Sequence, residues 1–146
     1  MNIITNNEEE TFAFAKKFAE TLEGGEIIGL IGDLGAGKTV FTKGLAAGLG
    51  IKNNVNSPTF VLMKVYKAKG KIKTLVHIDA YRLQNMADLV AIGAEDYFNR
   101  NDTITVIEWI DKIQSELPDN NLIIFNLAHQ NKDKRILSCG LKYKMI

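Results

Sequence analysis

Apolar residues recur along this chain with two different periods. Between residues 8 and 22 they fall on one helical face, and a second helical pattern runs from residue 40 to residue 49. Short apolar runs, typical of buried strands, occupy residues 26–31 and 103–107. Because helical and strand-like segments alternate, the pattern predicts an α/β fold with parallel strands in its sheet.

The first predicted helix lies near the N-terminus. Thr5 and Glu8 have the spacing of a capping box, and Gly24-Gly25 ends the helical pattern. The acidic residues 8–10 are then expected to form a solvated first turn, which the helix dipole favours.

The remaining segments predict hairpins and one short helix. Residues 51–58 have no usable periodicity and are predicted to form a loop. Residues 59–67 and 72–79 are strand-like runs separated by a turn, which indicates an antiparallel hairpin. A helix is expected near residues 86–92, and a closing pair of strands at 121–128 and 135–141.

Composition narrows the class of protein. A length of 146 residues predicts one domain, residues 1–146. Eighteen basic and seventeen acidic residues give a formal charge of +1, so no global field attracts nucleic acid or an anionic membrane. The single cysteine, Cys139, cannot form an internal disulfide, and the N-terminus lacks the basic and apolar regions of a signal peptide. No apolar run reaches the roughly 20 residues that span a bilayer. We therefore expect a cytoplasmic protein.

Residues 32–39 read Gly-Asp-Leu-Gly-Ala-Gly-Lys-Thr and fit the pattern G-x-x-x-x-G-K-[ST] at every fixed position. Glycines allow backbone amides to turn inward and form a nest for phosphate oxygens. Lys38 is expected to reach the β- and γ-phosphates, and the Thr39 hydroxyl is placed to bind magnesium. The motif predicts nucleotide binding. The fold expected is a P-loop NTPase-like, three-layer α/β fold whose mixed, mainly parallel sheet includes antiparallel hairpins.

Two predicted strands end in an acidic residue, Asp79 and Glu108. Ligands of open α/β sheets gather at the carboxyl ends of the strands, where an acid can reach magnesium or an attacking water. Asp79 therefore has a Walker B-like position. Glu108 is a second candidate, although a carboxylate that caps the following turn is an alternative. Trp109 is expected in the core or at an interface rather than against a ligand.

Other polar residues carry weaker signals. Ser57 and Thr59 face either the γ-phosphate and its metal or their own local backbone. Arg82 is the one further cation expected beside the site, although an ordinary surface arginine is favoured. His77 and His129 lack companions at metal-ligand spacing and are interpreted as structural. Residues 131–134, Asn-Lys-Asp-Lys, differ from the guanine-specifying Asn-Lys-x-Asp, so GTP is not inferred and a polar hairpin tip is expected.

Several stretches together resemble one family. These are the loop at 32–39, Ser-Pro-Thr-Phe at 57–60, His-Ile-Asp-Ala-Tyr-Arg-Leu at 77–83, Gly93 with Asp-Tyr-Phe at 96–98, and Ile-Glu-Trp at 107–109. In this order and spacing they are similar to the TsaE (YjeE) family, the small bacterial ATPase of tRNA threonylcarbamoyladenosine biosynthesis. The resemblance extends from about Thr5 to Glu108 and is weak beyond Pro118.

The resemblance implies an ATPase that uses ATP and Mg²⁺ and works with the TsaD and TsaB proteins. In that family these components attach a threonylcarbamoyl group to N6 of adenosine 37 in tRNAs that read codons beginning with A. Hydrolysis is implied to reset the complex between catalytic rounds, and tRNA is contacted only indirectly through the complex. Slow turnover alone and faster turnover with the partners are expected.

The resemblance also assigns roles by position. Lys38, Asp79 and Glu108 are implied as catalytic residues, and Thr39, Glu108 and Asp79 as magnesium ligands. Val40 replaces a frequent second threonine. The implied nucleotide contacts are Glu8, Thr11, Gly32, Asp33, Leu34, Gly35, Ala36, Gly37, Lys38, Thr39, Val40 and Asn131, of which Glu8, Thr11 and Asn131 belong to the adenine side.

Two other functions fit a phosphate-binding loop. In a small-molecule kinase, Asp79 would activate a substrate hydroxyl. Such kinases usually carry an arginine-rich lid, whereas this chain has only Arg82, Arg100 and Arg135. In a nucleotide-gated binding module, bound ATP would only shape an interface.

Overall fold

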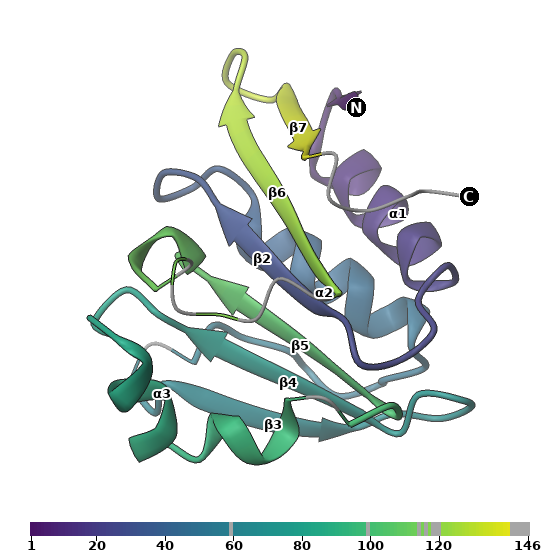
Figure 1. Cartoon of the computed structure of the whole chain (residues 1–146). Coiled ribbons are helices and arrows are strands. Elements are labelled where there is room, and N and C mark those ends of the chain that lie inside the picture. The colour runs from purple at the N-terminus through teal and green to yellow at the C-terminus, as the bar shows by residue number, and fades with distance from the viewer. Residues whose placement is uncertain (59, 99, 114, 116, 118–120, 141–146) are drawn as a thin grey trace.

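The computed structural model describes residues 1–58, 60–98, 100–113, 115, 117 and 121–140. Within these residues, seven strands form one sheet, with helices on both of its faces (Figure 1). The strands are β1 (Asn2–Thr5), β2 (Ile27–Ile31), β3 (Met63–Lys67), β4 (Thr74–Asp79), β5 (Thr103–Glu108), β6 (Leu122–His129) and β7 (Arg135–Cys139). The helices are α1 (Glu8–Ala19), α2 (Lys38–Gly48) and α3 (Met86–Ala91), with short 3₁₀ helices η1 (Ala94–Tyr97) and η2 (Ile110–Lys112).

The strand order is β1-β7-β6-β2-β5-β4-β3. The four central strands β6, β2, β5 and β4 are parallel to one another. Antiparallel strands complete both edges, through the β3–β4 and β6–β7 hairpins and the pairing of β1 with β7. The predicted three-layer α/β fold with a parallel centre and antiparallel hairpins is therefore confirmed.

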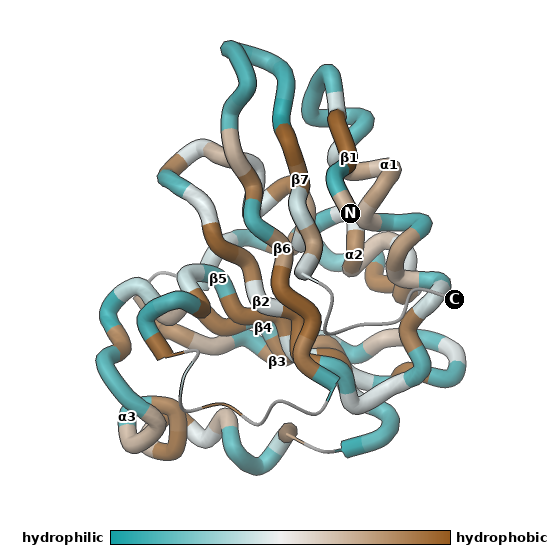
Figure 2. The backbone as a smooth tube through the Cα atoms, turned by 45° about the horizontal axis from the view of Figure 1, so that its top comes forward, coloured by the Kyte–Doolittle hydropathy of each residue, from teal (hydrophilic) through white to brown (hydrophobic). Residues whose placement is uncertain are grey.

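Each face of the sheet has its own apolar cluster. The central strands are the most hydrophobic part of the tube in Figure 2, and the tip of the β6–β7 hairpin is hydrophilic. On one face, α1 and α2 pack Phe18 and Phe41 against Phe125 of β6, with ring centroids 5.1 and 4.9 Å from that ring. On the other face, α3 and the two 3₁₀ helices bury Leu89 and Ile110. The sheet is thus covered on both sides, as strands that are apolar throughout require.

Helices α1 and α2 approach each other closely because α2 carries two glycines on the shared face. A Cβ on Gly44 would overlap the Phe12 carbonyl oxygen, and one on Gly48 would overlap the Lys16 carbonyl oxygen. Since the two glycines are one helical turn apart, their missing side chains form a groove for the α1 backbone. This packing fixes α2, whose first turn begins within the glycine-rich segment at residues 32–39.

The predicted capping box at Thr5 is wrong. Thr5 ends β1, a strand that the apolar pattern did not indicate, and α1 is capped by Asn7. The Asn7 side chain accepts the Glu10 N–H at 2.8 Å, and the Glu10 carboxylate accepts the Asn6 N–H at 2.7 Å. Asn7 therefore caps the helix as in a capping box, but the Glu10 carboxylate reaches back to the residue before the N-cap and not to the N–H of the N-cap itself.

The other predicted elements are found with small differences at their ends. β3 begins at Met63, later than the predicted run, and Thr59 lies outside the described residues. β7 ends at Cys139, and Leu141 also lies outside them. The loop at 51–58, the helix after residue 85 and the hairpin tip at 131–134 are confirmed. No helix in the described part of the chain has the length and apolar character needed to cross a membrane.

Candidate nucleotide-binding site

The glycine-rich loop connects the end of β2 to the start of α2, as the sequence predicted. Gly35 and Gly37 have φ angles of 80° and 105°, in the left-handed region that favours glycine. Gly37 occupies the N-cap of α2 and supplies no side-chain cap. The amides of the first helical turn are therefore available to an anionic ligand, toward which the helix dipole also points its positive end.

Lys38 is only 6% exposed, and its ammonium is held within the loop. Nζ donates to the carbonyl oxygens of Gly32 and Asp33, the latter at 2.9 Å, and lies 4.1 Å from the ring centroid of Trp109. Burial lowers the pKa of Lys38 below its ordinary value, although nearby carboxylates, Glu108 foremost, oppose the shift. The ammonium is thus held by neutral carbonyl and π partners, which a negatively charged phosphate group can replace.

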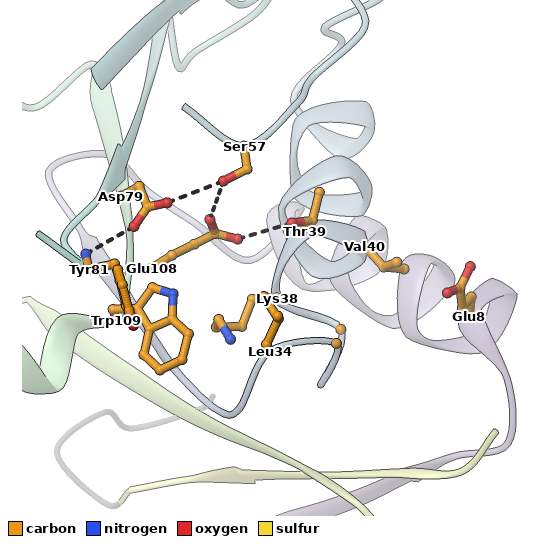
Figure 3. A pocket seen from close by; sticks show the side chains of 12 residues that line it. Glu8, Leu34, Lys38, Thr39, Val40, Ser57, Asp79, Tyr81, Glu108 and Trp109 are labelled. Atoms are coloured by element: carbon orange, nitrogen blue, oxygen red, sulfur yellow. Dashed lines mark hydrogen bonds between the residues drawn. The ribbon is translucent and has the colours of Figure 1, made fainter. Parts of the chain in front are cut away.

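The two strand-end acids lie side by side. Asp79 of β4 and Glu108 of β5 are paired across the sheet, and the Ser57 hydroxyl contacts both carboxylates, at 3.4 and 3.2 Å. The Thr39 hydroxyl lies 3.4 Å from the second oxygen of Glu108 (Figure 3). The Tyr81 N–H donates to Asp79 at 2.9 Å and orients that carboxylate. The first turn of α2 therefore faces an acidic pair that comes from two neighbouring strands.

Glu108 is 3% exposed, and its environment favours the ionised form. Burial alone would raise the pKa of Glu108, but contacts with His77, Ser57 and Lys38 outweigh burial and hold this pKa below its ordinary value. The Nε2 atom of the fully buried His77 lies 3.5 Å from the Glu108 carboxylate. An ionised carboxylate is the form that binds a divalent cation.

A cavity of about 610 Å³ opens between the loop, α2 and the acidic pair. This volume lies within the usual range for small-molecule sites, ~300–1,000 Å³. Its lining residues are Glu8, Leu34, Gly35, Gly37, Lys38, Thr39, Val40, Ser57, Asp79, Tyr81, Glu108 and Trp109.

The donor set fits magnesium held together with a nucleotide. Carboxylate and hydroxyl oxygens are the ligands that Mg²⁺ prefers, and this ion is commonly bound by one or two carboxylates plus substrate phosphates. Among the described residues, no group of three or more histidine, cysteine or acidic side chains is arranged to hold a metal. Thr39, Glu108 and Asp79 would hold such an ion from the protein side, and phosphate oxygens would supply further ligands.

Most of the predicted site residues line this cavity, but five do not. Gly32, Asp33 and Ala36 line a smaller cavity of about 330 Å³ beside β6. Thr11 is 1% exposed, and its hydroxyl is bound to that of Thr5 at 2.6 Å. The side chain of Asn131 closes the β6–β7 turn by accepting the N–H groups of residues 133 and 134. The adenine-side contacts implied for Thr11 and Asn131 stay predictions.

The sequence did not indicate two aromatic residues of the site. Trp109 packs on the core and also faces the cavity, where its ring meets that of Tyr81 at a centroid distance of 5.0 Å. Trp109 follows Glu108 by one position and Tyr81 follows Asp79 by two. This closeness to the strand-end acids is the sequence feature that could have placed both aromatic residues at the site.

The preferred interpretation of Arg82 as a surface arginine is confirmed. Arg82 is exposed, and its guanidinium lies 5.8 Å from the centroid of the Phe60 ring. Arg135 instead reaches the loop and donates to the Gly35 carbonyl at 3.3 Å. Arg82 therefore does not contact the loop in this structure. The arginine that does so is Arg135 of the distant strand β7.

A glycine-rich loop between a parallel strand and a helix, facing two strand-end acids, defines a P-loop nucleotide-binding protein of the α/β class. Residues 5–137 match the family model described as threonylcarbamoyl adenosine biosynthesis protein TsaE. The chain therefore belongs to the TsaE family.

Individual relatives agree with this membership. The chain is 38% identical over 144 residues to the tRNA threonylcarbamoyladenosine biosynthesis protein TsaE of Bacillus subtilis, covering 97% of this chain and 88% of that protein. It is 43% identical over 116 residues to the protein of the same name from Haemophilus influenzae, covering 76% and 72%. The crystal structure of Bacillus subtilis YdiB superimposes with a TM-score of 0.77 at 35% identity, over 94% of this chain and 82% of that one.

Proposed function

We propose that this protein binds ATP with Mg²⁺ and hydrolyses it in support of tRNA threonylcarbamoylation. The substrate is adenosine 37 of tRNAs that read codons beginning with A, and the partners are the TsaD and TsaB proteins. The proposal rests on membership of the TsaE family and on the names of the relatives. A cytoplasmic location, where tRNA is modified, is part of the proposal.

The observation that carries the catalytic part is the contact of Thr39 with Glu108 at the mouth of the phosphate-binding loop. Lys38 and the loop amides would bind the phosphates, and Thr39 and Glu108 would hold magnesium. When bound, Mg²⁺ neutralises charge that develops on the phosphoryl oxygens. Asp79 shares Ser57 with Glu108 and would orient the attacking water or accept its proton.

The charges of the site support dependence on partners. Phosphoryl transfer is accelerated by extra positive charge on the γ-phosphate, often from an arginine supplied in trans. Lys38 is the one cation among the described residues that line the cavity. We therefore infer slow hydrolysis by the protein alone and faster hydrolysis in the complex. The formal charge of +1 agrees with tRNA contact through partners.

A multiple-turnover modification assay tests the role of hydrolysis. TsaD, TsaB, tRNA, an activated threonylcarbamoyl donor and ATP are combined with wild-type protein or with Asp79→Asn. If hydrolysis resets the complex, the variant permits about one round per complex and then stalls, while the wild type continues. Sustained turnover with the hydrolysis-deficient variant would favour the nucleotide-gated binding module. A phosphorylated small molecule in place of free phosphate would favour the kinase.

A further inference from the structure

Arg135 is a buried cation that the roles proposed so far leave unexplained. It is the first residue of β7, where it pairs with His129 of β6 on one side and with Thr5 of β1 on the other. Its side chain is 9% exposed. Taking a guanidinium out of water is costly, so its surroundings must supply compensating contacts.

The guanidinium joins two parts of the chain. Nη1 donates to the carbonyl oxygens of Lys132 and Lys134 at 3.1 and 3.3 Å, and Nη2 donates to the Gly35 carbonyl at 3.3 Å. Among the described residues, no carboxylate lies within ion-pair distance of Arg135. The charge is therefore held by the carbonyl groups of the β6–β7 turn and of the phosphate-binding loop. The guanidinium reaches the two segments through two separate nitrogens in a fixed plane, whereas the donors of a lysine all come from a single atom.

The contact fixes one peptide group of the loop. In a trans peptide the C=O of Gly35 and the N–H of Ala36 point in opposite directions. Arg135 holds the C=O end, and the Asp33 carbonyl accepts the Ala36 N–H at 3.0 Å. The Gly35–Ala36 peptide is thus bound at both ends. Its carbonyl, which would repel a phosphate, is directed to a cation instead.

Fixing this peptide has a thermodynamic consequence. Gly35 has a φ of 80°, and glycine loses more conformational freedom on ordering than any other residue. A loop that is already ordered does not have to lose that entropy when a ligand binds, so the ligand binds more tightly.

We propose that Arg135 is a positioning residue for the phosphate-binding loop: it ties the β6–β7 turn to the Gly35–Ala36 peptide and pre-forms the site for nucleotide phosphates. This inference rests on the nucleotide binding proposed above. It also couples the β6–β7 turn to nucleotide binding. A nucleotide that orders the phosphate-binding loop would, through the Arg135 hydrogen bonds, also order the β6–β7 turn.

The affinity for ADP with Mg²⁺, measured by calorimetric titration well below the unfolding temperature, tests the proposal. Arg135→Met is compared with Lys134→Met, which removes the same charge from an exposed neighbour, and with Arg135→Lys, which keeps the charge but loses the fork. We expect binding to Arg135→Met to weaken roughly tenfold or more, as for the loss of hydrogen bonds to a charged group. Arg135→Lys should be intermediate and Lys134→Met unchanged. Equal affinity of Arg135→Met and wild type would overturn the proposal.

Hydrogen exchange of the wild-type protein gives a readout that does not depend on the stability of a variant. The Gln130 N–H is bonded to the Lys134 carbonyl at 2.9 Å, within the turn that Arg135 holds. ADP should slow exchange of this amide, and Arg135→Lys should reduce the slowing. Unchanged exchange in a wild type that binds ADP would refute the link, whereas failure of the wild type to bind ADP or ATP would refute the proposed function itself.

Discussion

Asp79 and Glu108 occupy directly paired positions at the ends of the parallel strands β4 and β5, and the Ser57 hydroxyl contacts both carboxylates. Only Glu108 also meets Thr39 of the phosphate-binding loop. Two acids that are equivalent in the sheet therefore differ in their relation to the loop. The proposal that Glu108 binds the metal and Asp79 serves hydrolysis rests on this difference.

The assignment predicts distinct defects for the two amide variants. Glu108→Gln should lose the strengthening of ADP binding by Mg²⁺, because it removes the charged oxygen nearest Thr39. Asp79→Asn should still bind nucleotide with Mg²⁺ but release phosphate roughly 100-fold more slowly or worse, as for loss of a general acid–base group. Titrations with Mg²⁺ and with a chelator, together with phosphate release, measure both effects. Mg²⁺ that still strengthens ADP binding to Glu108→Gln would contradict the assignment.

The lowered pKa of Glu108 predicts a stability change in acid. A carboxyl whose folded-state pKa is below its unfolded-state value stabilises the fold above the unfolded-state value, about 4.5, and loses this contribution as the pH falls through the folded-state value. The free energy of unfolding, without nucleotide or metal, should therefore fall less steeply between about pH 5 and pH 3 in Glu108→Gln than in the wild type. The free energy of unfolding is measured by urea titration at each pH. The same dependence on pH in Glu108→Gln and wild type would argue against a lowered pKa of Glu108.

The contact of α1 with α2 predicts a large effect of adding one methyl group. Gly44→Ala should destabilise the protein by about 1–3 kcal/mol, because strain from overpacking exceeds the gain in helix propensity of roughly 1 kcal/mol. Gly140 provides a control, since a Cβ there would meet no atom within 4 Å. Its replacement by alanine should change stability by less than about 0.5 kcal/mol. Chemical denaturation measures both, and equal stabilities of the two variants would show that the helices can separate freely.

Trp109 is the only tryptophan and lies against the Lys38 ammonium, so its fluorescence should report on the site. Lys38→Met should alter the emission of the nucleotide-free protein, whereas Lys43→Met, on the same helix, should not. ADP should shift the wild-type spectrum toward that of Lys38→Met, because in both cases the ammonium leaves the ring. Identical nucleotide-free spectra of wild type and Lys38→Met would mean that the contact is absent in solution.

The sequence predicted the parts of the site whose chemistry is local. The loop at 32–39 carries its glycines, lysine and threonine in one stretch, and Asp79 and Glu108 each end an apolar run. Parallel strands bring such ends to one edge of the sheet, so the convergence of the two acids followed from the strand assignment.

Contacts between distant segments were not predictable in this way. Arg135 reaches Gly35 across 100 residues, and no periodicity relates them. The short strand β1 is stabilised by pairing with β7, which lies about 130 residues later in the chain. The local sequence does not show this pairing, and from the local sequence alone Thr5 is interpreted as a helix cap. In sequence, both Thr5 and Asn7 are suitable N-cap residues for α1. The pairing of β1 with β7 places Thr5 in a strand, and Asn7 is therefore the N-cap.

Phosphate release from ATP, measured for wild type and Lys38→Ala with and without TsaD and TsaB, tests the central claim most directly. GTP is run in parallel to test the base preference. We predict slow release by the wild type alone, faster release with both partners, and release near background for Lys38→Ala in either case. Full activity of Lys38→Ala, or equal wild-type rates with and without the partners, would contradict this account of a partner-dependent ATPase.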